Sequence, residues 1–436
     1  MKRRIIWALA AALLLTIGLL SGSCAGEEAT TTTSAEEPAT TESTAPSTTA
    51  AALDRPVKIG GTLPLSGPAA GDGQRFLDGR KLAVKKINAA GGVLGQQIEL
   101  VVVDDGFEPA KVPSLYENLV RQDKLDVLLS SYGAPMTMPA MAVADKYDKL
   151  VLSGYSSSTG LMEQYGGKRF FTVAAQPKDK MYVNWFYRGL TDFLADFDSW
   201  NTKADVQKPT KIAVLNENQL WGIEQHDLWK PHAEQQGWEI VVDEFVEMNQ
   251  MEFSSLISKI KSANPDVIMT EFFYFRSVPF VKQLKEQGVK ADFVACSEAG
   301  TTADWADETK GAGAVGNNVI TFDYLPAAYT GGGSEEFRAD FKAEYGRDPG
   351  FLEAAGYAEV QVLAQAIETA GSIETDALRD ALLSGSFETV YTSAKFDSMG
   401  LNAEFNPVVG QWIDGRLESV YPKDAATAEL VYPFAQ

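Results

Sequence analysis

The stretch VKIGGTL, Val57–Leu63, starts the pattern that decides the fold of this 436-residue chain. It is a short β-rich run, and Phe76, Gly79, Ala83 and Ile87 follow it at the spacing of one helix face. A strand followed by an amphipathic helix is the repeating unit of α/β folds, in which helices cover a parallel sheet. The start of the folded region therefore predicts βα units.

Two blocks of such units follow one another along the chain. In the first block we predict strands at 57–63, 98–103, 126–130 and 150–153. In the second block we predict strands at 211–215, 239–246, 266–270 and 292–295, separated by helices near 222–236, 252–263 and 277–287. The fold class that this repetition predicts is α/β, with two doubly wound parallel-sheet lobes and a cleft between them.

The last third of the chain departs from this rhythm. Helices are predicted at 334–345 and 351–370, and strands at 408–413 and 416–421 are predicted to form a hairpin. The dipeptide Asp-Gly between these two strands is typical of a type I′ turn. Because such a segment can cross back between lobes, we assign 55–175 and about 303–385 to lobe 1, and about 176–302 and 386–436 to lobe 2.

The chain begins with the features of an exported lipoprotein. A basic start precedes an apolar run over 5–20, and small residues then lead to Cys24. This order predicts a signal peptide over 1–23 and a lipid on the thiol of Cys24. The apolar run is slightly short for a membrane-spanning helix, which needs about 20 residues. Residues 24–54, rich in Thr, Ser, Ala and Pro, are predicted to be a disordered linker.

The charge and the cysteine count narrow the classes of function. The chain carries a formal net charge of −21, and loss of 1–23, with three of its 38 basic residues, would leave −24. So negative a chain is not expected to bind nucleic acid or to lie flat on an anionic membrane. With Cys24 lipidated, Cys296 is left unpaired in an apolar run, and we expect it to be a buried structural thiol.

Three motifs that suggest chemistry have simpler interpretations. The stretch 311–316 matches G-x-G-x-x-G but precedes a predicted strand, so a flexible loop is favoured over a dinucleotide site. Asp104 and Asp105 follow a strand and are interpreted as turn residues. His226 and His232 are six residues apart, whereas zinc ligands on one helix face are four apart. We expect no metal, no cofactor and no catalytic residue.

Several motifs, in the same order along the chain, resemble the branched-chain amino acid (Leu/Ile/Val)-binding protein family. They are VKIGGTLPLSGP at 57–68, GGVLG at 91–95, the aspartate pair after a strand, FSSLI at 253–257, ANPDVI at 263–268 and QWIDG at 411–415. The resemblance covers nearly all of 56–421. It implies the type I periplasmic-binding-protein fold and the delivery of a small solute to the permease subunits of an ABC transporter.

The resemblance also implies which residues of the first lobe contact the ligand. A Tyr-Ser-Ser-like turn of the family corresponds to 132–137, so that Tyr132 lies at the site and Ala134 stands where a serine is expected. Backbone N–H groups at the start of the following helix can still bind an anion. In the next loop, Tyr155 lies beside the site and Ser157 falls on the family's ligand-binding threonine.

In the second lobe the resemblance implies three further contacts. Trp221 stands where the family usually has a tyrosine that lines the cleft, and Tyr274 follows another strand at the cleft edge. Glu298 falls near the acid that pairs with the ligand ammonium group. The site is therefore more aromatic than a plain Leu/Ile/Val site. The expected solutes include amino acids, amides or urea-like compounds, and aromatic or quaternary-ammonium molecules.

We therefore predict an extracytoplasmic, lipid-anchored solute-binding protein that is a monomer and not an enzyme. Its expected partners are a small-molecule solute and the permease subunits of an ABC importer, and it meets the membrane through its lipid alone. Lobes that close around the ligand would create the surface that the permease recognises. Two alternatives stay open: a ligand-sensing module for a separate signalling partner, and an envelope enzyme.

Overall fold

The structure is a computed structural model, and it describes residues 54–175, 193–201, 207–235, 237–310, 316, 318–406 and 408–432. The predicted signal peptide, Cys24 and almost all of the predicted linker lie outside the described residues, as does most of the glycine motif at 311–316. No helix in the described part of the chain is both long and apolar enough to cross a membrane.

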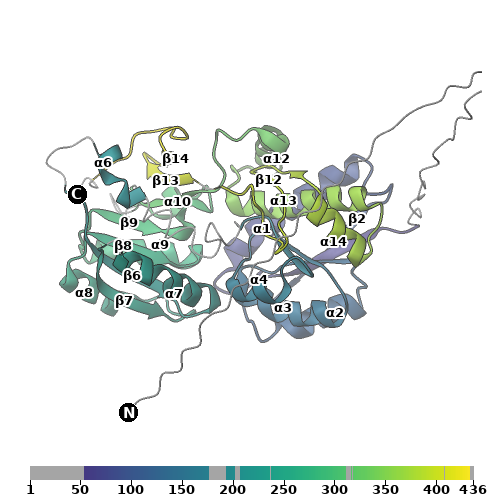
Figure 1. The fold of residues 1–436 in the computed structure, drawn as a ribbon, viewed down its shortest axis with the longest axis horizontal. Coiled ribbons are helices and arrows are strands. Elements are labelled where there is room, and N and C mark those ends of the chain that lie inside the picture. Colours follow the sequence, from purple (N-terminus) through teal and green to yellow (C-terminus); the bar gives the residue numbers. More distant parts are fainter. Residues whose placement is uncertain are drawn as a thin grey trace, which may run out of the picture. The chain divides into compact units, whose positions relative to one another are not determined.

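The first lobe is built on a five-stranded sheet in which all neighbouring strands are parallel (Figure 1). Its order is β2-β1-β3-β4-β5, with bounds Val57–Leu63 (β1), Ile98–Asp104 (β2), Val127–Leu129 (β3), Val151–Ser153 (β4) and Phe170–Thr172 (β5). The alternating helices are α1 (Ala70–Ala89), α2 (Val112–Arg121), α3 (Ala134–Lys146) and α4 (Thr159–Tyr165). The predicted βα units are confirmed, and β5 is a strand that we did not predict.

The second lobe is built on a seven-stranded sheet, in the order β14-β13-β10-β9-β8-β6-β7. The strands are β6 (Lys211–Glu217), β7 (Glu239–Val246), β8 (Val267–Glu271), β9 (Phe293–Cys296), β10 (Ile320–Asp323), β13 (Val408–Ile413) and β14 (Arg416–Tyr421). Strands β6 to β10 pair in parallel, whereas β13 is antiparallel to both β10 and β14.

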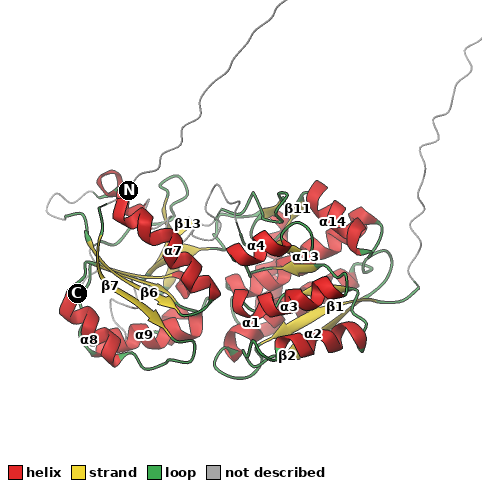
Figure 2. Cartoon of the chain, turned by 60° about the horizontal axis from the view of Figure 1, so that its bottom comes forward, coloured by secondary structure: helices red, strands yellow, loops and turns green. Residues whose placement is uncertain are grey.

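Helices lie on both faces of the seven-stranded sheet, as a doubly wound lobe requires (Figure 2). They are α6 (Phe197–Trp200), α7 (Leu220–Gln235), α8 (Ser254–Ala263), α9 (Tyr274–Glu286) and α10 (Trp305–Glu308), together with the short 3₁₀ helix η2 (Ser297–Gly300). The hairpin of β13 and β14 turns at Asp414 and Gly415, whose φ angles are 48° and 80°. Positive φ at both central residues confirms the predicted type I′ turn.

The C-terminal third crosses between the lobes at other places than we predicted. Within 303–385, β10 pairs with β9 in the second lobe. After a short 3₁₀ turn, η3 (Gly331–Gly333), the chain forms α12 (Ser334–Tyr345), α13 (Phe351–Ala370) and α14 (Thr375–Ser384), and α13 packs against α1 of the first lobe. Within 386–436, β11 (Phe387–Glu388) and β12 (Ser393–Ala394) pair beside α13, and Leu401 bridges Thr172 of the first sheet. A sequence pattern identifies a buried strand but not the sheet in which it pairs.

Two glycines let α1 and α13 pack closely in the first lobe. A Cβ at Gly79 would overlap the carbonyl oxygen of Glu353, and a Cβ at Gly356 would overlap a carbonyl oxygen of α1. Beside this contact, Arg80 of α1 and Glu359 of α13 are fully buried, with Nε and Oε2 2.7 Å apart. Arg80 also donates to the carbonyl oxygen at the end of β3. This buried pair therefore joins the helices to the carboxyl edge of the first sheet.

Candidate functional site

The described residues form a pocket at the carboxyl ends of strands from both sheets. It contains about 530 Å³ of space between atoms, part of it open to solvent. Its lining consists of Gly133, Ala134, Tyr155, Ser156, Ser157, Ala174, Glu217, Gln219, Trp221, Glu271, Phe272, Phe273, Glu298, Tyr324, Phe351 and Phe405. Open parallel sheets bind ligands at this edge, so the pocket is the candidate binding site.

The starts of α3 and α4 form the first-lobe side of the pocket. Helix α3 begins after Gly133, whose φ of 76° lies in the left-handed region that glycine tolerates. Helix α4 is capped by Ser158, whose Oγ accepts the N–H of Leu161 at 3.1 Å. Ala134 and Ser157, two of the predicted site residues, line the pocket at these two helix starts.

Neighbouring hydroxyl groups of the first lobe are engaged within the protein. Ser156 Oγ lies 2.7 Å from Thr137 Oγ1 and 3.0 Å from the carbonyl oxygen of Ser131. Thr137 Oγ1 lies 2.9 Å from the carbonyl oxygen of Gly133, because Thr137 is in the first turn of α3. The first-lobe wall is therefore neutral, and these hydroxyls find partners without a ligand.

Three carboxyl groups line the second-lobe side of the pocket. Glu217 is the last residue of β6, Glu271 is the last residue of β8, and Glu298 follows the end of β9. These strands are neighbours in the order β9-β8-β6, with Asn216 opposite Glu271. Parallel strands that end together bring the three side chains to one sheet edge.

Two of these carboxyl groups contact predicted site residues. Tyr155 of the first lobe donates its hydroxyl proton to Oε1 of Glu298, and Trp221 Nε1 donates to Oε2 of Glu271 at 3.2 Å. The other oxygen of each carboxyl group is buried and has no hydrogen-bond partner among the described residues. Burial raises the pKa of Glu271 to about 8 and the pKa of Glu298 well above its ordinary value, because it disfavours the charged form.

Glu217 is the third carboxyl group, and it pairs with a buried arginine. Its Oε1 lies 2.9 Å from Nη2 of Arg276 and accepts the N–H of Phe273 at 2.8 Å. Burial raises the pKa of Glu217 to about 7, although the positive charge of Arg276 opposes this rise. Its Oε2 is buried without a hydrogen-bond partner in the described part of the chain.

Aromatic rings form much of the remaining wall. Tyr155 stacks on Tyr132 with ring centroids 5.3 Å apart and an interplanar angle of 9°. Phe351 meets Tyr155 edge-on at 5.9 Å and stacks on Tyr324 at 4.6 Å. Phe273 packs against Tyr132 with centroids 5.2 Å apart. Such rings can stack on a planar ligand or attract a cation through the ring quadrupole.

Two of the predicted site residues do not line the pocket. Tyr132 is fully buried behind Tyr155, and its hydroxyl donates to Asp72 at 3.2 Å. Tyr274 begins α9 and turns its ring against Trp305, with centroids 6.0 Å apart. The other predicted residues, Ala134, Tyr155, Ser157, Trp221 and Glu298, are brought together at the pocket wall.

Glu217 and Glu271 are pocket residues that sequence reasoning missed. We predicted that their strands end at residues 215 and 270, but β6 and β8 continue to Glu217 and Glu271. A polar residue at the carboxyl end of a buried parallel strand was the available signal, because ligands bind at that edge. Both residues fall within the loops 216–222 and 271–277, which we expect at the cleft from the ends of their strands, but we did not predict either as a site residue.

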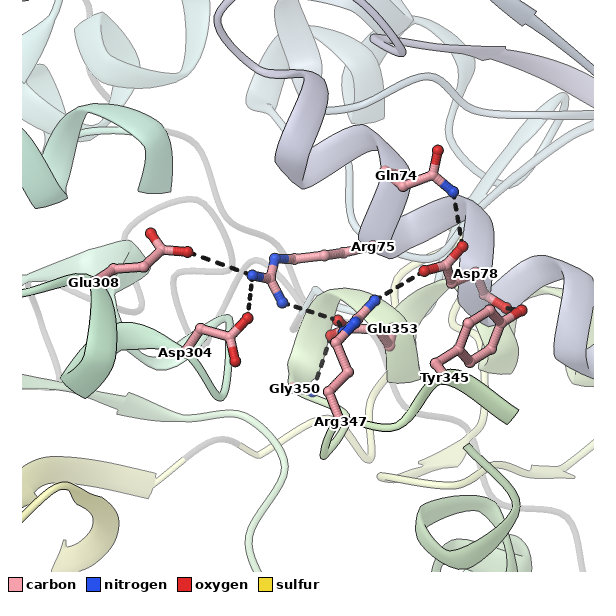
Figure 3. A network of polar contacts seen from close by, with 9 residues as sticks. All are labelled: Gln74, Arg75, Asp78, Asp304, Glu308, Tyr345, Arg347, Gly350 and Glu353. Atoms are coloured by element: carbon pink, nitrogen blue, oxygen red, sulfur yellow. Dashed lines mark hydrogen bonds and ion pairs between the residues drawn. The ribbon is translucent and has the colours of Figure 1, made fainter. Parts of the chain in front are cut away.

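Arg75 of α1 makes ion pairs that span the two lobes (Figure 3). Its guanidinium group pairs with Asp304, between β9 and β10 of the second lobe, and lies 3.3 Å from Glu353 of α13. Arg347 has a similar environment, but it pairs with Asp78 at 2.8 Å and with Glu353, both in the first lobe. Arg75 therefore joins the lobes, and Arg347 stays within one.

Other contacts also join the lobes beside the pocket. Glu224 of α7 accepts the N–H groups of Thr159 and Gly160 at the start of α4, at 2.7 and 3.1 Å. A carboxylate at a helix N-terminus is favoured by the helix dipole. The backbone of Gly133 approaches Phe273 so closely that a Cβ there would lie 2.8 Å from the ring.

The other groups that suggested chemistry have structural roles. Asp104 and Asp105 accept hydrogen bonds from backbone N–H groups of nearby turns, which confirms them as turn residues. Cys296 is buried, and burial raises the pKa of its thiol to about 12, as expected for a structural thiol. His226 lies 2.9 Å from a carboxylate oxygen of Asp243. The described residues contain no group of three or more His, Cys, Asp or Glu placed to hold a metal ion.

Comparison with known proteins shows similarity along most of the chain. A family model described as periplasmic binding protein matches residues 56–415. A protein of Pseudomonas aeruginosa named amino acid binding protein is 27% identical over 365 residues, which are 82% of this chain and 90% of that protein. Leu/Ile/Val-binding protein homolog 7 of Brucella abortus is 27% identical over 406 residues, 88% of this chain and 96% of that protein.

Solved structures share the fold. A leucine binding protein from Thermotoga maritima superposes with a TM-score of 0.72 at 18% identity, covering 84% of this chain and 99% of that chain. A solute binding protein of an ABC transporter from R. palustris, in complex with benzoate, has a TM-score of 0.73 at 19% identity, covering 84% of this chain and 95% of that chain. The two α/β lobes are those of type I periplasmic binding proteins.

Proposed function

Because the chain belongs to the periplasmic binding protein family, we propose that it captures one small solute between its lobes and delivers it to the permease subunits of an ABC importer. The proposed solute is an amino acid or a related amide or aromatic compound. Relatives named for amino acids, and a structural neighbour that holds benzoate, support this range. The protein binds and releases its solute and does not convert it.

The observation that carries the proposal is a pocket whose wall comes from both lobes. Tyr155 of the first lobe donates to Glu298 of the second, and Trp221 lines the wall beside them. A ligand that touches both lobes favours the arrangement in which they are close, and shifts a hinge equilibrium toward it. We assign direct ligand contacts to Tyr155, Ser157, Trp221 and Glu298, with the backbone at Ala134 beside them.

We place the protein outside the cytoplasmic membrane, as a monomer held by a lipid. The predicted signal over 1–23 and the thiol of Cys24 support this location. The linker over 24–54 would span roughly 30 Å as a flexible chain, so the lobes could turn toward a permease while staying at the surface. Metabolic labelling of Cys24 with a fatty acid, lost in Cys24→Ala, tests the anchor.

The capture of a solute is tested by a thermal-shift screen of the mature chain against amino acids, amides, urea, aromatic acids and amines. A ligand that binds only the folded state raises the melting temperature, and calorimetry then counts the sites. Trp221→Ala is expected to weaken binding of the hit by about tenfold, since it removes one wall of the pocket. Uptake of the labelled solute by cells separates delivery to an importer from sensing for another protein.

A further inference from the structure

Three buried carboxyl oxygens in the pocket have no hydrogen-bond partner in the part of the chain that the structure describes. They are Oε2 of Glu217, Oε1 of Glu271 and Oε2 of Glu298, and no described residue forms a hydrogen bond with them. The three residues are 0%, 3% and 7% exposed. A buried acceptor without a partner costs free energy, and folded proteins contain few of them. Three at one pocket wall indicate that a ligand supplies the missing donors.

We propose that the solute is an organic cation that carries several N–H groups, such as an amidinium, a guanidinium or a primary ammonium compound. This inference rests on the proposed function, since it names the class of solute that the same pocket binds. The inference makes the proposed class of solute more specific, because carboxylic acids and neutral amides are then not the preferred ligands.

The need for N–H groups follows from the chemistry of the wall. A cationic ligand favours the ionised form of these carboxyl groups, and ionised carboxylates only accept hydrogen bonds, so the ligand must donate. Amidinium and guanidinium groups present four or five N–H donors in one plane, and bonds between them and a carboxylate are charge-assisted. A quaternary ammonium ion has a positive charge but no N–H, and it would leave the three oxygens unpaired.

The charges around the pocket favour a cation over an anion. Arg276 compensates Glu217, but no cation is paired with Glu271 or Glu298 among the described residues. The first-lobe wall has Ala134 where the resemblance predicts a serine for the ligand carboxylate, and the hydroxyl of Ser156 already has partners. An anionic ligand could gain donors only from Ser157 and the backbone N–H groups at the helix starts of the first lobe, and it would meet three carboxyl groups on the opposite wall.

The arrangement also favours an organic cation over a metal ion. The three carboxyl groups line one pocket, yet within the described ranges they do not form a cluster tight enough to hold a metal. The aromatic residues Tyr155, Trp221 and Phe351 share the wall with them. Rings of this kind attract organic cations and bury their apolar parts. The pocket thus matches a cationic nitrogen group on a compact, partly apolar body.

The test compares ligands of one shape and opposite charge. Benzamidine and benzoate have the same ring, but the first is a cation with N–H donors and the second is an anion. Benzyltrimethylammonium is a cation without N–H groups, and L-leucine represents the zwitterions. Each is titrated into the mature chain by calorimetry, and into Glu271→Gln, Glu298→Gln and Glu286→Gln. Glu286 is exposed on α9, so its variant removes the same charge away from the pocket.

Benzamidine is expected to bind at least tenfold more tightly than the other three probes. Glu271→Gln and Glu298→Gln should each weaken its binding by tenfold or more, and Glu286→Gln by less than twofold. Either pocket variant decides the matter if the other fails to fold. Tighter binding of benzoate or L-leucine, equal binding of benzyltrimethylammonium, or no effect of both pocket variants overturns the inference and leaves solute capture standing. No response to any compound, in this set or in the wider screen, overturns both.

Discussion

The polar groups at the two sheet edges that face the pocket differ in their hydrogen bonding. At the first-lobe edge, the hydroxyls of Thr137 and Ser156 bond to each other and to backbone carbonyls. At the second-lobe edge, Glu217, Glu271 and Glu298 each keep one oxygen without a partner in the part of the chain that the structure describes. The second edge therefore presents buried carboxyl oxygens that need donors, whereas among the described residues the first edge presents no carboxyl group to the pocket. Specificity should therefore depend mainly on the second lobe.

The same contrast holds for the buried arginine of each lobe. Arg80 pairs with Glu359 between two helices, does not line the pocket, and contributes to the packing of α1 on α13. Arg276 pairs with Glu217, whose carboxyl group lines the pocket. One pair serves the fold alone, whereas the other also sets the charge of the candidate site.

The largest expected effect is on stability, in the variant Arg276→Met. Removal of one partner of a buried ion pair typically costs about 3–5 kcal/mol. We expect about 3 kcal/mol, the lower end of that range, because the raised pKa of Glu217 lets it take up a proton when the arginine is gone. Urea unfolding of the empty protein measures this loss.

The matched control is the double variant Arg276→Met with Glu217→Gln. It removes both charges, so it should recover most of the stability that the single variant loses. If the single and double variants are equally unstable, then Arg276 acts through its packing and through its bond to the carbonyl oxygen of Glu247, and not through Glu217.

The second prediction concerns the approach of the two edges. In Gly133→Ala, the new Cβ would lie 2.8 Å from the ring of Phe273, so the edges must move apart. We expect ligand affinity to fall by about tenfold, which is about 1.4 kcal/mol. The backbone of Gly133, with φ 76° and ψ 166°, is in a region that is essentially restricted to glycine, so alanine adds a cost of about 2 kcal/mol to the folding of the first lobe.

These two costs can be separated. Adding Phe273→Leu to Gly133→Ala makes room for the methyl group but leaves the backbone strain in place. The double variant should therefore bind the ligand more tightly than Gly133→Ala does. Its free energy of unfolding should stay as low as that of Gly133→Ala. No recovery of affinity would indicate that strain in the first lobe, and not the contact between the edges, weakens binding.

Much of this fold could be predicted from the sequence, because local patterns of residues define many of its helices and strands. The strands Val57–Leu63 and Arg416–Tyr421 and the helix Phe351–Ala370 have the predicted bounds, since periodicity and turn residues define them. The sheet in which β10 pairs depends on contacts far away in the chain, and no local pattern encodes them. For the same reason, the sequence places Glu298 near the site through a resemblance and the loops of Glu217 and Glu271 at the cleft, but it does not show which of their side chains line the pocket.

The third prediction is a pH dependence that belongs to the second-lobe edge. Glu271 has a pKa of about 8 in the folded protein, well above its ordinary value of about 4.5. Between these values the folded state holds a proton that the unfolded state releases, so stability falls as pH rises. The contribution is fully present below about pH 4.5 and is lost as the pH passes through about 8.

We expect the melting temperature of the empty protein to fall by a few degrees between pH 5 and 8. Glu271→Gln, which cannot titrate, should show a shallower fall over this range than the unchanged protein. Parallel pH curves for the two proteins would mean that other buried carboxyl groups, such as Asp72 of the first lobe, carry the dependence.

The smallest expected effect comes from the ion pairs between the lobes, outside the pocket (Figure 3). Arg75→Gln removes the pairs with Asp304 and Glu308, whose side chains are 33% and 41% exposed and therefore screened by water. We expect ligand affinity to fall by about threefold, or about 0.7 kcal/mol. The loss should shrink as salt is added, since exposed ion pairs weaken at high ionic strength.

Arg347→Gln is the control that assigns this loss to the contact between lobes. It shares Glu353 with Arg75, but its other partner, Asp78, lies in the first lobe. It should lower the stability of the protein and leave affinity almost unchanged. Equal losses of affinity in both variants would mean that Glu353 and the start of α13 position the pocket wall. Arg75 would then affect binding through its pair with Glu353 in the first lobe, and not through its pair with Asp304 in the second lobe.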